Sequence, residues 1–320
     1  CSEFTAALKL VHEIRAHVLL AGMNIKVDTD QLPQWCSFAY LVDSADITSY
    51  LDQNAIGKYQ KADIIYREIL SIFYDVAPKG LKLRAASAEE MRIITFMPCS
   101  GGVGSSTAAA ACAKALAATG ESVLYLNIET NGLADAYFTG EGVASFSDII
   151  TALKLKRSNL TIKIESALRT DPSGVSFFSS PKHALDIREF NAEDAETLLN
   201  NLTKFKTVII DSDLGTDGIA KELMKLSTTV VLVGDGSATS NIKLERLIDT
   251  LSIMDENENT GIISKIMLLY NKLTQRSSTR EYDRVGVLGT IQAFNSASEQ
   301  RIVDLVASSG AFSKLCMGGE

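Results

Sequence analysis

The chain has 320 residues, 46% of them hydrophobic, and a formal net charge of −8 at pH 7. That length favours two domains over one, and that hydrophobic content can build sizeable cores. The acidic balance argues against non-specific binding to duplex DNA, which needs a basic face. No apolar run approaches the roughly 20 residues that span a bilayer. We therefore expect neither nucleic acid as a partner nor an integral membrane span.

The first 84 residues predict a small α/β unit. We expect strands at residues 17–20 and 38–42 and an amphipathic helix from about residue 60 to residue 74. Two strands are too few to close a sheet comfortably, and the chain begins at Cys1 without an initiator methionine, so we expect a preceding segment to supply the others. The apolar stripe of the helix consists of Ile64, Ile65, Ile69, Ile72 and Phe73.

A linker is predicted after this unit. Residues 85–90 (Ala-Ala-Ser-Ala-Glu-Glu) are small and polar, and Ala77-Pro78-Lys79-Gly80 lies just upstream. Both stretches are typical of a connection between domains. We therefore predict one domain over residues 1–84 and a second over residues 91–320.

Strand and helix patterns alternate regularly through the second domain. Its apolar runs, such as Val208-Ile209-Ile210, are continuous, which is typical of parallel strands buried on both faces. An Ala-rich segment at 108–118 predicts a helix that lies close on the sheet and ends at Gly120. This pattern predicts an α/β fold with a doubly wound parallel sheet. The expected strands are 92–96, 122–127, 174–178, 207–211, 229–234, 266–271 and 285–289.

A glycine-rich segment, Ser100-Gly101-Gly102-Val103-Gly104-Ser105-Ser106-Thr107, joins the first of these strands to the Ala-rich helix. Such a turn lets successive backbone N–H groups point inward, and the helix adds the positive end of its dipole, so the two together hold phosphate oxygens. The lysine that usually ends this loop is absent, because Ser105 stands in its place. We predict a nucleotide site at Ser100–Thr107 that lacks part of its charge; the alternative is a vestigial loop that binds nothing.

Further motifs follow the loop in order: Val123–Glu129, which resembles V-L-L-I-D-x-D; Thr207–Asp211, which resembles a Walker B strand; Leu269–Lys272, which resembles V-x-N-[RK]; and Val287–Ile291, which resembles V-L-G-x-I-P without the proline. The loop itself is similar to K-G-G-x-G-K-[ST]-T with both lysines replaced by serine. Together these motifs resemble the deviant P-loop ATPases of the MinD/ParA group.

Two more segments, Phe146–Ile150 and Val175–Pro181, look like the TadZ/CpaE branch of this group. That branch comprises pilus-assembly relatives that carry a receiver-like domain ahead of the ATPase domain. His17–Gly22 stands where a receiver ends its third strand in a phosphoacceptor aspartate, and here that strand ends without a carboxylate. The resemblance implies an atypical, degenerate receiver-like domain that is not phosphorylated.

The resemblance also assigns residues to a nucleotide and a metal ion. It implies ATP or ADP at the loop, Mg²⁺ beside Ser106 and Asp211, an adenine contact for Asn271, and a catalytic Glu129 that orients the attacking water. Glu129 could equally be a strand-end carboxylate that only caps a loop, and Asn271 an ordinary strand-end residue.

The missing lysines lead us to expect weak function of the loop. Loss of charge-assisted bonds at Ser105 predicts about 10- to 150-fold weaker nucleotide binding unless another cation substitutes. Lys272 and Arg246 are candidates for that cation. Ser100 cannot supply the charge that the family's signature lysine brings across a dimer, so hydrolysis should be slow or absent.

Two functions compete at this point. The first is a cytoplasmic ATP-binding localisation or assembly factor that forms a homodimer and serves pilus or related secretion machinery, recruited through partners to a cell pole or the inner membrane. The alternative is an active ParA/MinD-type ATPase in DNA partitioning or division positioning. A dinucleotide oxidoreductase does not fit, because the loop is not G-x-G-x-x-G. Residues 299–306 predict an amphipathic helix of mixed charge that packs on the protein rather than on a membrane.

Cysteines and histidines add no metal or disulfide chemistry. No cysteine pair has CxxC spacing, and no histidine spacing suggests a metal site. Cys99 and Cys112 lie on apolar segments, so we expect buried free thiols in a reducing compartment. The other members of the two sets are Cys1, Cys36, Cys316, His12, His17 and His183.

Overall fold

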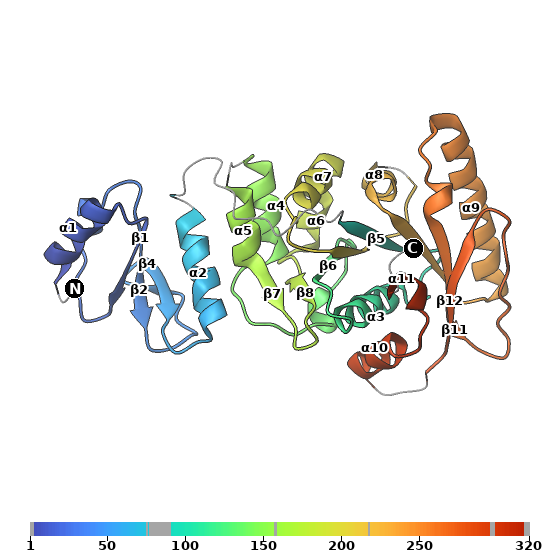
Figure 1. The fold of residues 1–320 in the computed structure, drawn as a ribbon, viewed down its shortest axis with the longest axis horizontal. Helices are drawn as coiled ribbons and strands as arrows, with labels where there is room; N and C mark the ends of the chain where they lie inside the picture. Colours follow the sequence, from blue (N-terminus) through green and yellow to red (C-terminus); the bar gives the residue numbers. More distant parts are fainter. Residues whose placement is uncertain are drawn as a thin grey trace. The chain divides into compact units, whose positions relative to one another are not determined.

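A computed structural model describes residues 3–74, 76, 91–156, 159–216, 218–294 and 298–316 (Figure 1). The backbone forms two compact units. The smaller unit comprises Cys1–Ala85 and Glu141–Leu168, and the larger unit comprises Ala86–Gly140 and Arg169–Glu320. The predicted linker at 77–80 and 85–90 lies outside the described residues, as does Cys1. The segment Glu141–Leu168 is an excursion of the chain out of the larger unit, and it belongs to the smaller one. The sequence did not predict this excursion.

The smaller unit has a four-stranded sheet in the order β1-β2-β4-β3. The β1–β2 and β2–β4 pairs are parallel, and the two-residue β3 runs antiparallel to β4. The predicted strands and helix are confirmed as β1, β2 and α2, whereas α1, β3 and β4 were missed. The elements are α1 (Phe4–Ile14), β1 (Val18–Gly22), η1 (Thr29–Gln31), β2 (Ser37–Val42), β3 (Ser49–Tyr50), β4 (Gln53–Gly57) and α2 (Ala62–Tyr74).

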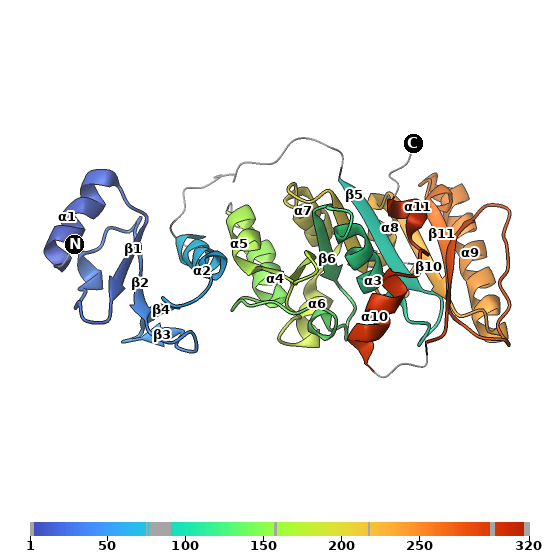
Figure 2. The same cartoon turned by 60° about the horizontal axis from the view of Figure 1, so that its bottom comes forward.

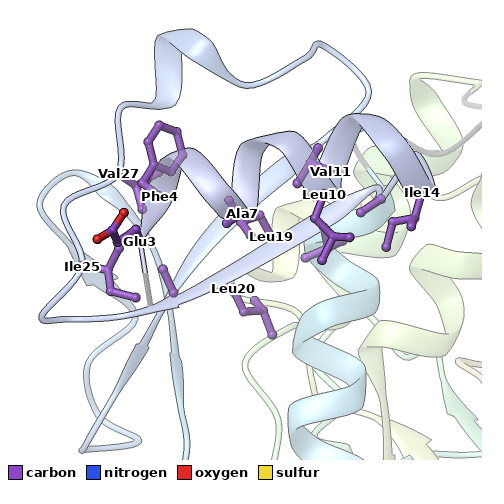
Figure 3. Close-up of a pocket in the computed structure, with 13 residues that line it drawn as sticks. Glu3, Phe4, Ala7, Leu10, Val11, Ile14, Leu19, Leu20, Ile25 and Val27 are labelled. Atoms are coloured by element: carbon purple, nitrogen blue, oxygen red, sulfur yellow. The ribbon is translucent and has the colours of Figure 1, made fainter. Parts of the chain in front are cut away.

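An apolar groove runs between α1 and β1 (Figure 3). It has a volume of about 280 Å³ and is lined by Val11, Leu20 and their neighbours from these two elements. Two further side chains at its rim, Leu10 and Ile14, are 43% and 65% exposed. The groove therefore leaves part of the apolar face of α1 open to solvent.

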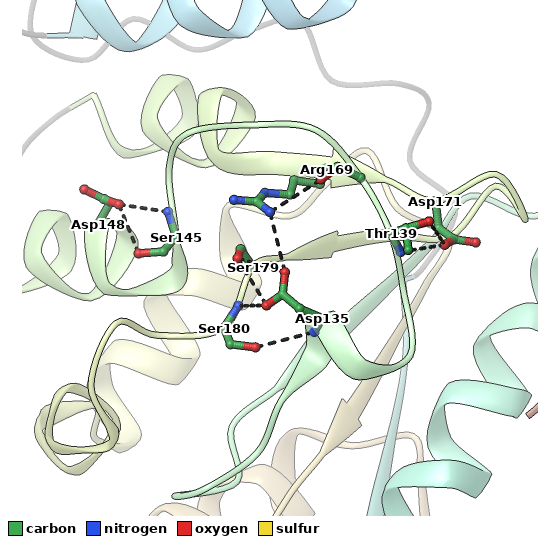
Figure 4. Close-up of polar contacts among 9 residues, drawn as sticks. Asp135, Thr139, Ser145, Asp148, Arg169, Asp171, Ser179 and Ser180 are labelled. Carbon is green, nitrogen blue, oxygen red and sulfur yellow. Dashed lines mark hydrogen bonds and ion pairs between the residues drawn. The ribbon is translucent and has the colours of Figure 1, made fainter. Parts of the chain in front are cut away.

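Two helices from the excursion at Glu141–Leu168 complete the smaller unit. α4 (Phe146–Lys154) begins at a capping box, in which the backbone N–H of Ser145 donates to Asp148 at 2.8 Å (Figure 4). α5 (Leu160–Ala167) packs against α2, and Arg67 of α2 donates a hydrogen bond to the carbonyl of Leu168. Strands β1–β4 and this helical excursion therefore belong to one compact unit.

The larger unit is built on one sheet with the order β12-β11-β10-β5-β9-β6-β8-β7. Its central pairs are parallel, and β5 lies between β10 and β9, so the chain winds outward in both directions from β5. The predicted doubly wound sheet is confirmed, and the short β7 was missed. The strands are β5 (Arg92–Pro98), β6 (Val123–Asn127), β7 (Leu168–Thr170), β8 (Ser176–Phe178), β9 (Thr207–Asp211), β10 (Thr229–Gly234), β11 (Ile266–Leu273) and β12 (Gly286–Gln292).

Small side chains bring α3 (Ser105–Ala117) close to this sheet. The residues from Ala108 to Ala113 are fully buried. The helix ends shortly before Gly120, which has a φ of 88°. α10 (Glu299–Ala307) lies beside α3 (Figures 1 and 2), buries Val303 and Val306, and pairs Asp304 with Lys114 at 2.8 Å. The C-terminal helix is therefore packed on the protein, as predicted.

The remaining helices connect the strands of the larger unit. They are α3 (Ser105–Ala117), η2 (Ala134–Ala136), α6 (Ala184–Glu189), α7 (Ala192–Asn200), α8 (Gly218–Leu226), α9 (Ala238–Glu258), η3 (Ile263–Lys265), α10 (Glu299–Ala307) and α11 (Ser313–Cys316). No helix in the described part of the chain is long and apolar enough to cross a bilayer. Cys36, Cys99 and Cys112 are buried free thiols, as predicted.

Hydrogen bonds hold together the two points where the chain leaves and re-enters the larger unit (Figure 4). Arg169, at the return point, donates to the carbonyl of Gly140, at the exit point, at 3.4 Å. Asp135 pairs with Arg169, and Asp171 accepts the backbone N–H of Thr139 at 2.8 Å. The excursion therefore starts and ends on a hydrogen-bonded stem.

Candidate nucleotide-binding site

The glycine-rich loop follows β5 at the point where the strand order reverses, which is where doubly wound sheets hold their ligands. Gly102 and Gly104 have φ values of 80° and 81°, a left-handed conformation that favours glycine. A Cβ on Gly104 would lie 2.6 Å from the Nδ2 of Asn271. Glycine is therefore needed at position 104 both for its backbone conformation and for space.

An open cavity of about 630 Å³ lies over the loop. That volume is within the range of small-molecule and cofactor sites. Every residue from Ser100 to Thr107, the predicted nucleotide-binding loop, lines this cavity, and so does Glu129. The other lining residues are Pro98, Tyr137, Asp213, Leu214 and Lys272.

β11 braces the back of the loop. The side-chain amide of Asn271 donates to the carbonyls of Val103 at 3.0 Å and Gly104 at 3.2 Å. Asn271 is 3% exposed and does not line the cavity in the described structure. Its observed contacts hold the loop in shape, and the adenine contact implied by the resemblance stays a prediction.

Asp211, which was predicted from the sequence as a metal ligand, lies on the β9 side of the loop. It ends β9 and pairs in register with Phe96 of β5 and Asn127 of β6, so it is fully buried between neighbouring strands. Its Oδ2 accepts hydrogen bonds from the hydroxyl of Tyr125 at 2.8 Å and from the Nδ2 of Asn127 at 2.9 Å. Asp211 therefore lies beneath the cavity wall rather than in it.

The surroundings of Asp211 disfavour its charge. Burial raises the pKa of this carboxyl to about 8, and the neighbouring carboxylates of Glu129 and Asp213 add to the rise. The nearby hydroxyl groups of Tyr125 and Ser106 act in the opposite direction. Without a cation nearby, Asp211 is therefore largely protonated at neutral pH.

Three buried oxygens at the site have no hydrogen-bond partner among the described residues. They are Oδ1 of Asp211, Oδ1 of Asn127 and Oγ of Ser105. Buried polar atoms are nearly always paired in folded proteins, so these three fit a site that a hydrated cation or a ligand completes. Carboxylate, amide and hydroxyl oxygens are also the hard donors that Mg²⁺ prefers.

Glu129 and Ser106 are linked at the rim of the cavity. The Oγ of Ser106 donates to Oε2 of Glu129 at 3.0 Å. This bond uses the hydroxyl proton and leaves the lone pairs of Ser106 free to bind a cation. The described residues contain no group of three His, Cys, Asp or Glu side chains that could hold a metal alone, so phosphate oxygens would have to complete a Mg²⁺ shell.

Three side chains of the cavity were not predicted from the sequence or were left unplaced. Asp213 accepts from the backbone N–H of Thr130 at 2.8 Å, Tyr137 follows η2, and Lys272 donates to the carbonyl of Gly102 at 2.9 Å. The position of Asp213, two residues after a Walker B-like aspartate, was a usable signal. Arg246, the other candidate cation, is exposed on α9 and is not among the described residues that line the cavity.

The smaller unit matches a protein-family model by sequence. Residues 2–74 match the model described as "TadZ-like, receiver domain". Among curated proteins, no sequence matches the chain.

The larger part of the chain is similar to solved structures. The ParA family ATPase of Chlorobium tepidum shares 19% identity at a TM-score of 0.53, over 71% of this chain and 96% of that one. The MinC:MinD cell division protein complex of Aquifex aeolicus shares 17% identity at a TM-score of 0.51, over 72% of this chain and 96% of the matched chain. MinD of Pyrococcus horikoshii, solved with Mg-ADP, shares 14% identity at a TM-score of 0.51, over 68% of this chain and 94% of that one. At these identities the likeness establishes the fold.

Proposed function

From a TadZ-like receiver domain in the smaller unit and a larger unit with the fold of MinD and ParA ATPases, we propose that the protein is a nucleotide-binding localisation or assembly factor for Tad-type pilus or related secretion machinery. The larger unit binds ATP or ADP with Mg²⁺ and forms a homodimer, and hydrolysis is weak or absent. Partners recruit the protein to a cell pole or the inner membrane.

The loop geometry carries this proposal. Two left-handed glycines, a helix N-terminus at Ser105 and a cavity of about 630 Å³ remain in place although both loop lysines are serines. Backbone N–H groups and the helix dipole supply most of a phosphate cradle, and neither depends on those lysines. A vestigial loop would have no need to keep Gly104 packed against Asn271.

The remaining residues take roles around a bound nucleotide. Ser106 would contribute a hydroxyl lone pair to Mg²⁺, and Asp211, once ionised, would help to hold the hydrated ion. Mg²⁺ would neutralise phosphate charge when bound. Ser100–Thr107 orient the phosphates through the backbone, and Asn271 keeps the loop carbonyls turned away from them.

Weak hydrolysis follows from the charge at the reacting end of the site. Phosphoryl transfer depends on cations that stabilise charge developing on the phosphate. Ser100 and Ser105 supply none, and the carboxylate of Glu129, which accepts a hydrogen bond from Ser106, adds no positive charge. The protein therefore acts by binding and assembly, with the nucleotide as a structural ligand.

A dimer with little dependence on ATP fits the same residues. Two facing loops without lysines repel each other less when no nucleotide is bound, so association does not need ATP to screen charge. Any preference of ATP for the dimer must appear as an equal effect of dimerisation on ATP affinity. A receiver-like domain without a phosphoacceptor is consistent with such a standing platform.

Sedimentation and phosphate release, each measured as Mg-ATP is titrated, test this function. We expect a dimer with and without nucleotide and phosphate release far below that of a lysine-bearing relative. A monomer under both conditions contradicts the platform. Brisk hydrolysis that scales with purified protein contradicts the assembly role and supports the alternative, an active ParA/MinD-type ATPase.

A further inference from the structure

We propose that Lys272, at the end of β11, supplies the phosphate-facing positive charge that the loop lost at Ser105. The inference rests on the proposed nucleotide binding and identifies the residue that makes a lysine-free loop workable. Its ligand is the polyphosphate of a nucleoside di- or triphosphate. The charge comes from a neighbouring strand instead of from the loop.

The backbone of β11 directs Lys272 toward the loop. The pairing of β11 with β12 is irregular between Tyr270 and Leu273, so the strand bulges at Asn271 and Lys272. Lys272 has a φ of 54°, a left-handed conformation that a lysine rarely adopts. Strained backbone of this kind is often found at functional sites, where it aims a side chain.

The ammonium group reaches the phosphate cradle itself. Its Nζ donates to the carbonyl of Gly102 at 2.9 Å, and its Cε would lie 3.0 Å from a Cβ on Gly104. Lys272 and Asn271 thus bond three consecutive carbonyls of the loop, those of Gly102, Val103 and Gly104. An ammonium has three N–H donors, so two remain for phosphate oxygens.

The charges of the cavity make this lysine necessary. Glu129 and Asp213 line the cavity with two carboxylates, and Lys272 is the one cationic side chain among the described residues that line it. No carboxylate forms an ion pair with Lys272 within the described structure, whose salt bridges lie elsewhere. Without Lys272, the only charged side chains that line the cavity within the described structure would be negative, and their repulsion of a polyphosphate acts strongly in a partly buried site.

Binding measurements on four variants test the assignment. The probes are Mg-ATP, Mg-ADP and adenosine, titrated into the whole chain by calorimetry. We expect Lys272→Gln to weaken Mg-ATP binding about 10- to 150-fold, the range for a lost charge-assisted bond, and to leave adenosine unchanged. Lys272→Arg, which keeps the charge, should retain most of the affinity. Lys243→Gln, on the exposed side of α9, is the matched control and should bind as the unmodified protein does.

The fourth variant separates charge from bracing of the loop. Adding Ser105→Lys to Lys272→Gln returns a cation to the usual loop position and should restore Mg-ATP affinity. If Lys272 only braced the Gly102 carbonyl, this second change would restore nothing, and adenosine binding would fall together with that of ATP. That result overturns the inference and leaves the proposed function intact, as does equal Mg-ATP affinity of Lys272→Gln and the unmodified protein.

Chemical labelling tests the same point without a substitution. Brief treatment with acetic anhydride, read by mass spectrometry, reports the accessibility of each lysine amine. We expect Mg-ATP to protect Lys272 about 10-fold or more while Lys243 reacts unchanged. Equal labelling of Lys272 with and without Mg-ATP, under conditions where calorimetry shows binding, overturns the inference. If the unmodified protein binds no nucleotide at millimolar concentration, the proposed function fails and this inference fails with it.

Discussion

The carboxyl edges of the two sheets differ in whether their charged side chains are paired with each other. In the smaller unit, Asp43 follows β2 and Lys58 follows β4, and the two form an exposed ion pair with each other. In the larger unit, Asp211 is buried with one oxygen that has no partner among the described residues, and the ammonium of Lys272 donates to the carbonyl of Gly102. At the first edge the two charges neutralise each other, whereas the second edge leaves a buried carboxyl group and a lysine ammonium without an ion-pair partner among the described residues. Chemistry that depends on a ligand is therefore expected at the larger unit's edge.

The largest effect is expected from a substitution at the carboxyl edge of the larger unit's sheet. Gly104→Ala forces a non-glycine residue into a left-handed conformation and drives a Cβ to within 2.6 Å of Asn271. The strain and the loss of the Asn271 bonds should lower the free energy of unfolding by about 2–4 kcal/mol and abolish nucleotide binding. Denaturant unfolding measures the first effect.

Gly101→Ala is the control for that experiment. Gly101 has no positive φ, and a Cβ there meets no atom within 4 Å. Its free energy of unfolding should stay within about 0.5 kcal/mol of the unmodified value. Equal stability of the two variants would show that Asn271 does not depend on the glycine.

The pH dependence of Asp211 gives a smaller effect per pH unit. Because the folded pKa, about 8, exceeds the unfolded value near 3.8, the folded state keeps a proton that the unfolded state releases between these pH values. Stability contributed by the protonated carboxyl is therefore fully present below pH 4 and is lost as pH rises through 8, at about 1.4 kcal/mol per pH unit.

Thermal melts from pH 5 to 9 measure this slope. Asp211→Asn should remove most of it, because an amide does not titrate. Mg²⁺ with nucleotide should also flatten it, because a cation favours the ionised carboxylate. A melting temperature of the unmodified protein that rises with pH over this range, or an unchanged slope in Asp211→Asn, would contradict the uncompensated burial of Asp211.

The smallest effect is expected at the neutralised edge. Lys58→Gln removes an ion pair whose side chains are 38% and 60% exposed, and exposed pairs contribute little to stability. We expect no measurable change in the melting temperature and unchanged nucleotide affinity. A loss of Mg-ATP binding in this variant would show that the two edges are not independent in the way that the comparison requires.

Much of the fold could be predicted from the sequence, for a physical reason. Strands buried on both faces must be continuously apolar, so β9 and β10 are evident from Val208–Ile210 and Val230–Val233. β4, with the sequence Gln-Asn-Ala-Ile-Gly, has no such signal and is a strand because it pairs with β2 and β3. The excursion at Glu141–Leu168 could not be predicted, since the unit to which it belongs is decided by packing between α5 and α2.

The site was predictable only where spacing decides geometry. The two glycines at 102 and 104 between a strand and a helix indicate a phosphate loop without reference to the rest of the chain. The bracing role of Asn271 depends on which carbonyls β11 passes, and the reach of Lys272 depends on a bulge. Neither is encoded in a local pattern, so both required the structure.

Calorimetric titration of Mg-ADP into the unmodified protein tests the central claim most directly. That claim is that the loop at Ser100–Thr107 binds nucleotide although it carries no lysine. We predict one nucleotide bound per chain, with a dissociation constant below millimolar, and no binding in Gly104→Ala. Absence of binding to the unmodified protein at millimolar Mg-ADP would contradict the claim and identify the loop as a vestige that keeps only its shape.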